Sequence, residues 1–500
     1  MKIFSATQIR QADSYTIEHE PIASIDLMER ASVAFCQKFT TLYTAQNQHV
    51  LIFCGTGNNG GDGLAIARIL AQNSYRVKVS VLGNVATATV DFLENFKRLP
   101  HSILNTSITA HADFPLLSDH EIIIDALFGS GLNRPIEGLA ADLIHHINVS
   151  GASIVSIDIA SGLFADKHTP GSAIVQPDQT ITFQLPKLAF FLPENDRYVG
   201  AWHVVDIGLN QEFINNQATS HFFLQKEDVA PLLPVRKKFG HKGDFGRLLL
   251  VAGGQGKMGA AVLAARAALR SGVGLLYAHS PKVGRDVLQV SVPEAMVMED
   301  GNDAVITAIS AWQQMDAIAI GPGIGTQAET IQALQQLIKV WKKPLVLDAD
   351  AINCLALQPD LLKELPNDSI LTPHPGEFRR LVGDWTDDFH RLELLCSFCQ
   401  KHQVNMVLKG AHSAICDSCG NVYFNSTGNP GMATGGSGDV LTGILGALLA
   451  QGLTPSEALR LGVYIHGLAG DIGANALGEI SLAASDIIDS LPQAFAQLKN

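Results

Sequence analysis

The sequence has no excess of basic residues and no long uninterrupted apolar run. Its 35 Lys and Arg against 48 Asp and Glu give a formal charge of -13, which has the wrong sign for a nucleic-acid or anionic-membrane partner. The most apolar stretches, such as "DVLTGILGALLAQGL", are broken by Gly and charge, so we expect no membrane span. The amino terminus is polar from its start and predicts no signal peptide. There, Ser5 and Gln8 have the spacing of a capping box, which predicts a first helix. We expect a cytoplasmic protein.

The sequence is also poor in cysteine, with seven in 500 residues, as is typical of a reducing compartment. Four of them, Cys396, Cys399, Cys416 and Cys419, have the spacing of a zinc ribbon. However, the first pair lies in a predicted amphipathic helix and the second flanks a predicted hairpin turn, "CDSCGN". Thiols in such contexts pack as small hydrophobic groups, so we favour packing over zinc.

Two series of short apolar runs alternate with helical segments, one over residues 49–208 and one from about residue 247 onward. Such alternation predicts the α/β class, with mostly parallel sheets covered by helices. The intervening stretch is polar and rich in proline and basic residues, which indicates a boundary. We therefore predict a first domain over residues 1–215, a linker over 216–239 and a second domain over 240–500.

The first glycine-rich loop, "GTGNNGGDG" at residues 55–63, follows the apolar run "HVLIFC". Gly55, Gly57 and Gly60 fit the dinucleotide fingerprint. A nicotinamide dehydrogenase should also carry an acid at the end of the next strand to hold a ribose, and "RVKVSVLGN" ends without one. The loop therefore does not favour hydride transfer.

Polar side chains follow three strands of this predicted sheet. Asn59 and Asp62 lie in the glycine loop, Asp125 closes "EIIIDALFGSG", and Asp158 with Ser161 follows "SIVSI". Each acid alone could cap the following helix. Because the carboxyl ends of neighbouring parallel strands meet at one crevice, we favour a site that holds a cation and one acid/base carboxylate.

The motifs "LMERAS", "GTGNNGGDGLAIAR", "DALFGSGLNRPIEG" and "SIDIASG" resemble the epimerase domain of the NAD(P)H-hydrate repair enzymes over nearly all of residues 1–215. This resemblance implies a Rossmann-like three-layer domain that interconverts the R and S forms of NADH or NADPH carrying water at C6. It implies potassium ligands at Asn59, Asp125 and Ser161 and an acid/base at Asp158, while Ala160 stands where the family usually has proline. The walls of the hydrate site would be Asn58, Asn59, Gly60, Gly61, Asp62, Gly129, Ser130, Gly131, Leu132, Asn133, Arg134, Pro135 and Asp158.

The second glycine-rich loop, "ATGGSGDVLTGI" at residues 433–444, runs into an apolar helix and predicts an anion-binding helix terminus. The residue that closes the glycines is Asp439, where a phosphate loop would have lysine. Lys409 in "VLKGAHSAI", His374 in "LTPHPGEF" and Gly323 in "GPGIG" complete the parts expected of a phosphoryl-transfer site. Asp439 could merely complement the helix dipole, but the preceding glycines favour a general base that faces the attacking hydroxyl.

These segments together resemble the ADP- or ATP-dependent NAD(P)H-hydrate dehydratases, which have a ribokinase-like fold, over residues 240–490. The resemblance implies phosphorylation of the C6 hydroxyl of the S hydrate and elimination of phosphate, with Mg²⁺ bridging the nucleotide phosphates. The implied nucleotide contacts are Lys409, Gly410, Ala411, His412, Ser413 and Gly438, and the implied hydrate contacts are Ala261, Gly323, His374 and Asp439.

Two alternatives remain at this point. The second domain could be a small-molecule kinase of the same fold that releases a phosphorylated product. The first domain could be a binding module that no longer catalyses a reaction. For either assignment we expect small-molecule partners, no nucleic acid, no membrane and a homo-oligomer.

Overall fold

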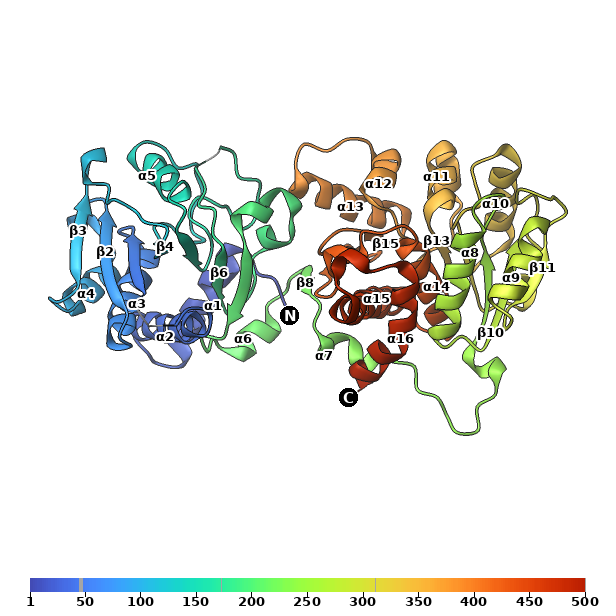
Figure 1. The fold of residues 1–500 in the computed structure, drawn as a ribbon, viewed down its shortest axis with the longest axis horizontal. Coiled ribbons are helices and arrows are strands. Elements are labelled where there is room, and N and C mark those ends of the chain that lie inside the picture. Colours follow the sequence, from blue (N-terminus) through green and yellow to red (C-terminus); the bar gives the residue numbers. More distant parts are fainter. Residues whose placement is uncertain (45–47, 172, 311, 500) are drawn as a thin grey trace. The chain divides into compact units, whose positions relative to one another are not determined.

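A computed structural model describes residues 1–44, 48–171, 173–310 and 312–499 (Figure 1). The chain divides into two compact units, each of α/β class, which confirms the predicted fold class. The first unit comprises Lys2–Thr219 with Asp387–Phe389, and the second comprises Met1, Ser220–Thr386 and His390–Asn500. Within the described ranges, no helix combines the length and the apolarity that a membrane crossing requires.

The first unit is built on a seven-stranded parallel sheet in the order β3-β2-β1-β4-β5-β6-β7. The order reverses between β1 and β4, and in open sheets ligands bind beside that switch point. The central strands are nearly continuous apolar runs because both faces are covered. The strands are β1 (His49–Cys54), β2 (Arg76–Leu82), β3 (Leu104–Ile108), β4 (Glu121–Ala126), β5 (Ser153–Ile157), β6 (Gln179–Phe183) and β7 (Ala201–Val205).

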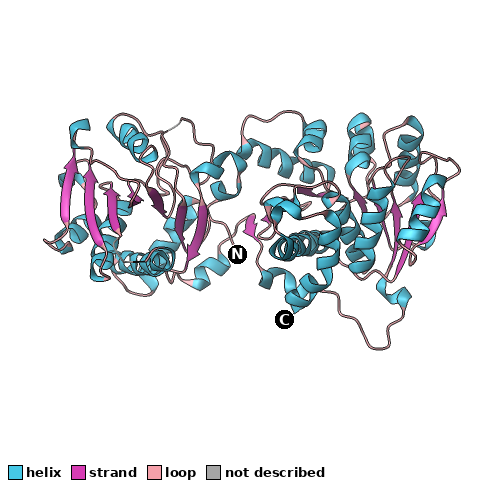
Figure 2. Cartoon of the chain, viewed as in Figure 1, coloured by secondary structure: helices cyan, strands magenta, loops and turns pink. Residues whose placement is uncertain are grey.

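Helices pack around this sheet, as Figure 2 shows. The capping box predicted at Ser5 and Gln8 is present and begins the first helix. The helices are α1 (Ala6–His19), α2 (Ser24–Leu42), α3 (Asn58–Gln72), α4 (Val90–Arg98), α5 (Leu139–Asn148) and α6 (Gln211–Asn216).

The second unit is built on a ten-stranded sheet in the order β11-β10-β9-β12-β13-β14-β15-β16-β17-β8. All neighbours are parallel except that β16 runs antiparallel to β15 and β17. The strands are β8 (His221–Phe223), β9 (Arg247–Val251), β10 (Leu275–Ser280), β11 (Met296–Glu299), β12 (Ala317–Ile320), β13 (Leu345–Leu347), β14 (Ile370–Leu371), β15 (Asn405–Leu408), β16 (Ala414–Cys416) and β17 (Val422–Phe424).

The core of the second unit centres on α14, most of whose residues are buried. It packs against α8 so closely that a Cβ at Gly443 would lie 2.1 Å from the Ala264 carbonyl oxygen. The helices are α7 (Lys226–Val229), α8 (Met258–Arg270), α9 (Arg285–Ser291), α10 (Ala328–Val340), α11 (Ala349–Leu357), α12 (Pro375–Val382), α13 (Asp388–His402), α14 (Ser437–Ala450), α15 (Pro455–Leu477) and α16 (Ala484–Lys499).

Residues 216–239, which the sequence predicts to be a linker, contain regular structure. They include β8, which pairs with β17 as the edge strand of the second sheet, and the short helix α7. Leu224 and Val229 are buried in the core of the second unit.

Candidate active sites

A cleft of about 780 Å³ opens at the switch point of the first sheet. Residues of α1, α2, the β1–α3 loop and the β4–α5 loop line it, together with the segment after β5. The structure brings eight of the predicted site residues to its wall: Asn58, Asn59, Asp62, Gly129, Ser130, Gly131, Leu132 and Asp158.

The other predicted residues of this site do not line that cleft. Gly60 and Gly61 are buried in the first turn of α3, where a Cβ at Gly60 would lie 1.8 Å from the Gly55 carbonyl oxygen. Glycine is required there because α3 must approach the end of β1 closely. Asn133, Arg134 and Pro135 lie further along the β4–α5 loop, beyond the lining residues.

A buried polar network lies behind the cleft. Asp125 is fully buried; its Oδ1 lies 2.5 Å from Ser161 Oγ, and its Oδ2 accepts hydrogen bonds of 2.8 Å from the Ser156 hydroxyl and the Ser161 backbone N–H. Burial raises the pKa of Asp125, and hydrogen bonds from Ser161 and Ser156 offset part of that rise. Ser161 Oγ also accepts from the Phe128 backbone N–H at 2.8 Å.

The donor set of this network suits a hard cation. It offers a carboxylate, a hydroxyl and the amide of Asn59, whose side chain lies next to Gly129. Asn59 Nδ2 is buried without a hydrogen-bond partner. The two ends of an Asn amide are told apart only by their hydrogen-bond partners. With the amide turned by about 180°, the side-chain oxygen of Asn59 would occupy this position. The predicted residues Asn59, Asp125 and Ser161 therefore fit a cation.

Asp158 follows β5 and has a strained backbone, with φ of 65°. Its Oδ1 accepts a 2.6 Å contact from Lys187 Nζ, a hydrogen bond from Thr182 Oγ1 at 3.1 Å and one from the Phe183 backbone N–H at 3.0 Å. Lys187 is 1% exposed. Lys187 was not predicted from the sequence. The signal was a lysine inside the apolar run "QLPKLAFFLP", since lysine is seldom fully buried unless it is paired.

Asp158 shares its cleft with two further acids, Asp13 of α1 and Asp62 of α3. Burial, followed by the charge of Asp158, raises the pKa of Asp13 to about 6. Burial and then the charges of Asp158 and Asp13 raise the pKa of Asp62 well above its usual range. Asp13 was not predicted from the sequence, because no strand-end rule applies to the middle of a helix.

In the second unit, the neighbouring parallel strands β9, β12, β13, β14 and β15 end at one edge of the sheet. Asp348 directly follows β13, Thr372 follows β14 and Lys409 follows β15. The amino terminus of α14 adjoins this edge, because a Cβ at Gly438 would lie 3.1 Å from Lys409 Nζ and 3.8 Å from Asp348 Oδ2. The predicted residues Lys409, Gly438 and Asp439 therefore lie together.

Asp348, which the sequence analysis did not assign, is central to this edge. It is 1% exposed; its Oδ1 accepts from Lys409 Nζ at 2.8 Å and from Thr372 Oγ1 at 2.6 Å, and its Oδ2 accepts from Thr442 Oγ1 at 2.6 Å. Burial alone would raise the pKa of Asp348, but Lys409 and the hydroxyls outweigh it and hold that pKa below its usual range. The sequence could have predicted Asp348, because it is an acid directly after a buried strand. The same rule identified Asp125 and Asp158.

Asp439 occupies the first turn of α14, after Gly436 with φ of 93°. Burial, then the charge of Asp348, raises the pKa of Asp439 to about 6, while Lys409 opposes the rise. His466 of α15 lies nearby, with Nε2 3.3 Å from Ser437 Oγ. Burial, then Lys409, lowers the pKa of His466 to about 4, so this ring is neutral at pH 7.

The remaining predicted hydrate contacts are spread around this edge. Gly323 has φ of 70°, and a Cβ there would lie 3.5 Å from Ala260 Cβ. Ala261 is 1% exposed, and its side chain belongs to the core. His374 is exposed and caps α12, with Nδ1 accepting from the Gly376 N–H at 3.0 Å.

The predicted nucleotide contacts after Lys409 form the turn between β15 and β16. Gly410 and Ala411 are exposed. Ser413 Oγ accepts from the Gly410 N–H at 3.3 Å, and His412 Nδ1 lies 3.2 Å from the Asn425 carbonyl oxygen.

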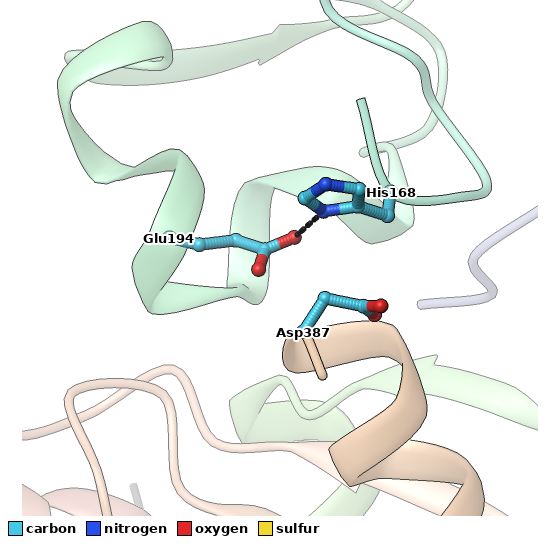
Figure 3. A group of neighbouring side chains, drawn as sticks. All are labelled: His168, Glu194 and Asp387. Carbon is cyan, nitrogen blue, oxygen red and sulfur yellow. Dashed lines mark hydrogen bonds and ion pairs between the residues drawn. The ribbon is translucent and has the colours of Figure 1, made fainter. Parts of the chain in front are cut away.

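The four cysteines considered for zinc lie in α13 and around β16, where Cys399 and Cys416 are buried and Cys419 is exposed. Among the described residues, the group of three metal-capable side chains whose ligand atoms all lie within 4.8 Å is a different one, His168, Glu194 and Asp387 (Figure 3). His168 Nδ1 lies 3.0 Å from Glu194 Oε1, and Glu194 also exchanges hydrogen bonds with Asp388. These partners account for the group without a metal.

Comparison with known proteins gives matches to both units. Residues 24–189 match the family model described as YjeF-related protein N-terminus, and residues 248–493 match the one described as NAD(P)H-hydrate dehydratase. The chain is 36% identical to a bifunctional NAD(P)H-hydrate repair enzyme of Moorella thermoacetica, over 100% of this chain and 97% of the relative. It is 33% identical to the enzyme of the same name from Escherichia coli, over 98% of this chain and 93% of the relative.

Two solved structures resemble the second unit. The ADP/ATP-dependent NAD(P)H-hydrate dehydratase of Bacillus subtilis, co-crystallized with ATP and Mg²⁺, is 31% identical and covers 56% of this chain and 100% of its own, with a TM-score of 0.49. A ribokinase-like superfamily protein of Enterococcus faecalis is 27% identical and covers 57% of this chain and 99% of its own, with a TM-score of 0.49.

Proposed function

The chain belongs to the family of bifunctional NAD(P)H-hydrate repair enzymes, and from this premise we propose that it restores hydrated NADH and NADPH at two separate active sites. The first unit is the epimerase, which interconverts the R and S hydrates. The second unit is the dehydratase, which converts the S hydrate to NAD(P)H at the expense of ADP or ATP. The epimerase supplies the S form, so both hydrates are repaired.

In the epimerase, the hydrated ring enters the cleft at the switch point. Asn58, Asn59, Asp62 and residues 129–132 would contact it from the walls of this cleft, and Asp158 would transfer the proton of the C6 hydroxyl. Lys187 supports this role because its ammonium lies 2.6 Å from Asp158 Oδ1 and holds the side chain in place. Thr182 and the Phe183 N–H bind the same oxygen, which leaves Oδ2 for the substrate.

We propose that Asn59, Asp125 and Ser161 hold a potassium ion. When bound, the ion would supply positive charge that orders the two glycine-containing loops and attracts the oxygens of the substrate. Burial disfavours the charged form of the Asp125 carboxyl group, and a bound cation would offset that cost. The buried carboxylate therefore supports the assignment.

The observation that carries the dehydratase assignment is the carboxylate of Asp439 at a glycine-preceded helix terminus beside Lys409. The backbone N–H groups around Gly438 would bind the transferred phosphoryl group. Lys409, held by Asp348, would neutralise part of the phosphate charge. Asp439 would take the proton of the C6 hydroxyl, whose oxygen then attacks the terminal phosphoryl group of the nucleotide.

Phosphorylation solves the leaving-group problem of dehydration. Hydroxide is a poor leaving group, whereas the phosphate ester at C6 departs when the N1 lone pair forms a double bond to C6. Loss of a proton from C5 then gives NAD(P)H. Gly323, His374 and the region of Ala261 would contact the hydrate, and the turn at residues 409–413 would contact the nucleotide.

Mg²⁺ would bind together with the nucleotide and neutralise part of its phosphate charge. The carboxylates of Asp348 and Asp439 at the edge of the second sheet would give it acidic surroundings. We further propose that the protein acts in the cytoplasm as a homo-oligomer on small-molecule substrates.

The test uses a mixture of R and S hydrates with ADP or ATP and follows the absorbance of reduced nicotinamide. Conversion of both epimers is expected. Conversion of only the S form would exclude the epimerase, and no conversion would exclude the dehydratase. A stable phosphorylated product without NAD(P)H would instead identify a small-molecule kinase.

A further inference from the structure

The epimerase cleft contains an acid to which the mechanism above gives no role. Asp13 of α1 lines the same cleft as Asp158. Within the described part of the chain, no hydrogen-bond donor or ion-pair partner contacts the Asp13 carboxylate, whereas three donors hold Oδ1 of Asp158. One carboxylate is thus fixed beside a buried cation, and the other is available to the substrate.

The chemistry of the hydrate restricts how C6 can be inverted. C6 carries a hydroxyl, a hydrogen, C5 and N1, and no adjacent carbonyl makes its hydrogen acidic. Loss of the hydroxyl would give an iminium ion, which would lose a proton from C5 and become NAD(P)H without any nucleotide. Breaking the bond between C6 and N1 avoids that outcome. N1 is a competent leaving group because its electron pair is delocalised through C2 and C3 into the carboxamide.

We propose that Asp13 is a second catalytic residue of the epimerase, the acid that protonates N1 as Asp158 removes the proton of the C6 hydroxyl. This inference rests on the proposed epimerase function. The O–H electron pair becomes the second bond of an aldehyde at C6, and the pair of the C6–N1 bond moves to N1, which takes the proton of Asp13. Rotation about the C5–C6 bond presents the other aldehyde face.

Ring closure reverses each transfer. The N1 pair attacks C6, the aldehyde oxygen takes the proton from Asp158, and N1 returns its proton to Asp13. Both carboxyl groups regain their first state, and no oxidant, reductant or water is consumed. The step requires one ionised and one protonated carboxyl group in the same cleft, a separation that different environments commonly produce.

Asp13 and Asp158 have different surroundings. Lys187 lies against Asp158, while burial and the charge of Asp158 raise the pKa of Asp13 to about 6. Asp13 is therefore protonated more often at neutral pH than an ordinary aspartate. The charged groups around it are Arg10 on its own helix, Asp62 on α3, Asp158 after β5 and Lys187 in the loop after β6.

The test compares wild type with Asp13→Asn in the full chain, starting from purified R hydrate with ADP or ATP. Asp13→Asn should slow R-to-S conversion, corrected for the spontaneous rate, by about 10²- to 10⁴-fold, and should leave dehydration of the S hydrate unchanged. The wild-type epimerisation rate should fall as pH rises above about 6. This decrease with pH should be absent in Asp13→Asn. Glu18→Gln, an exposed acid on the same helix, is the matched control and should behave as wild type.

Three results would overturn the inference. The first is an Asp13→Asn enzyme that epimerises at the wild-type rate. The second is an Asp13→Glu enzyme as slow as Asp13→Asn, because restoring the acid should recover at least about a tenth of the rate. The third is uptake of one solvent oxygen per conversion in H₂¹⁸O, since ring opening keeps the C6 oxygen. A wild-type enzyme that only matches the spontaneous rate would instead refute the epimerase function itself.

Discussion

Protonation of Asp439 should stop dehydration of the S hydrate in a defined pH range. A general base must be ionised, and the pKa of this carboxyl is raised to about 6 by burial and by Asp348. The rate should therefore rise with pH through about 6. About nine-tenths of Asp439 is ionised at pH 7 and about one-tenth at pH 5, so the rate at pH 5 should be roughly tenfold lower.

The origin of this midpoint can be tested separately. Asp348→Asn removes the negative charge that raises the pKa of Asp439, and it also releases Lys409, whose charge lowers that pKa. Both effects have the same sign, so the midpoint of the pH profile should move to lower pH in this variant. A midpoint that moves upward would contradict the electrostatic account.

Asp439→Asn should reduce dehydration by about 10²- to 10⁴-fold, the usual contribution of a general base, while nucleotide binding measured by calorimetry stays largely intact. Asp486→Asn is the matched control, because Asp486 also lies in the first turn of a helix and caps it. If Asp439 only complements the helix dipole, both variants should lose stability and neither should lose activity. The assignment would be refuted if Asp439→Asn dehydrated the S hydrate at the wild-type rate. A wild-type dehydration rate that did not change between about pH 5 and 7 would also refute it.

Three other predictions concern ion binding, pH stability and packing. Potassium chloride should raise the melting temperature of wild type more than choline chloride does, because a bound ion stabilises the folded state, and Asp125→Asn should lose this difference. The contribution of His466 to the unfolding free energy should rise between about pH 4 and 6.5, because unfolded His466 binds a proton that the folded residue, with a pKa of about 4, does not; the difference in unfolding free energy between wild type and His466→Gln should therefore increase with pH over this range in urea titrations. Gly443→Ala should cost about 1–3 kcal/mol by overpacking, whereas Gly259→Ala on α8, where a Cβ meets nothing within 4 Å, should be neutral or stabilising by urea unfolding.

The fold was predictable because its information is local. Parallel strands buried on both faces must be apolar runs, and the helices between them carry their own start signals, such as the capping box at Ser5 and Gln8. The strand-end rule also predicted much of each site. It predicted that Asn59, Asp125 and Asp158 share one crevice; in the structure Asn59 and Asp158 line the cleft, while Asp125 is fully buried.

The residues that the sequence did not reveal act through tertiary contacts. Asp13 reaches the cleft from the middle of a helix, and the buried Lys187 reaches Asp158 from a loop whose path no periodicity specifies. His466 lies within the apolar helix α15, where its burial depends on the packing of α14. Asp348 is different, because it directly follows a strand and the same rule could have identified it.

The edge strand β8 determines where the two activities can be physically separated. A chain that began at residue 240, the start of the predicted second domain, would lack β8 and leave the backbone of β17 unpaired. It would also lose the buried side chains of Leu224 and Val229. An unpaired edge promotes association between molecules. A dissected dehydratase should therefore start upstream of Ser220, since the short segment that joins the two enzymes belongs structurally to the second.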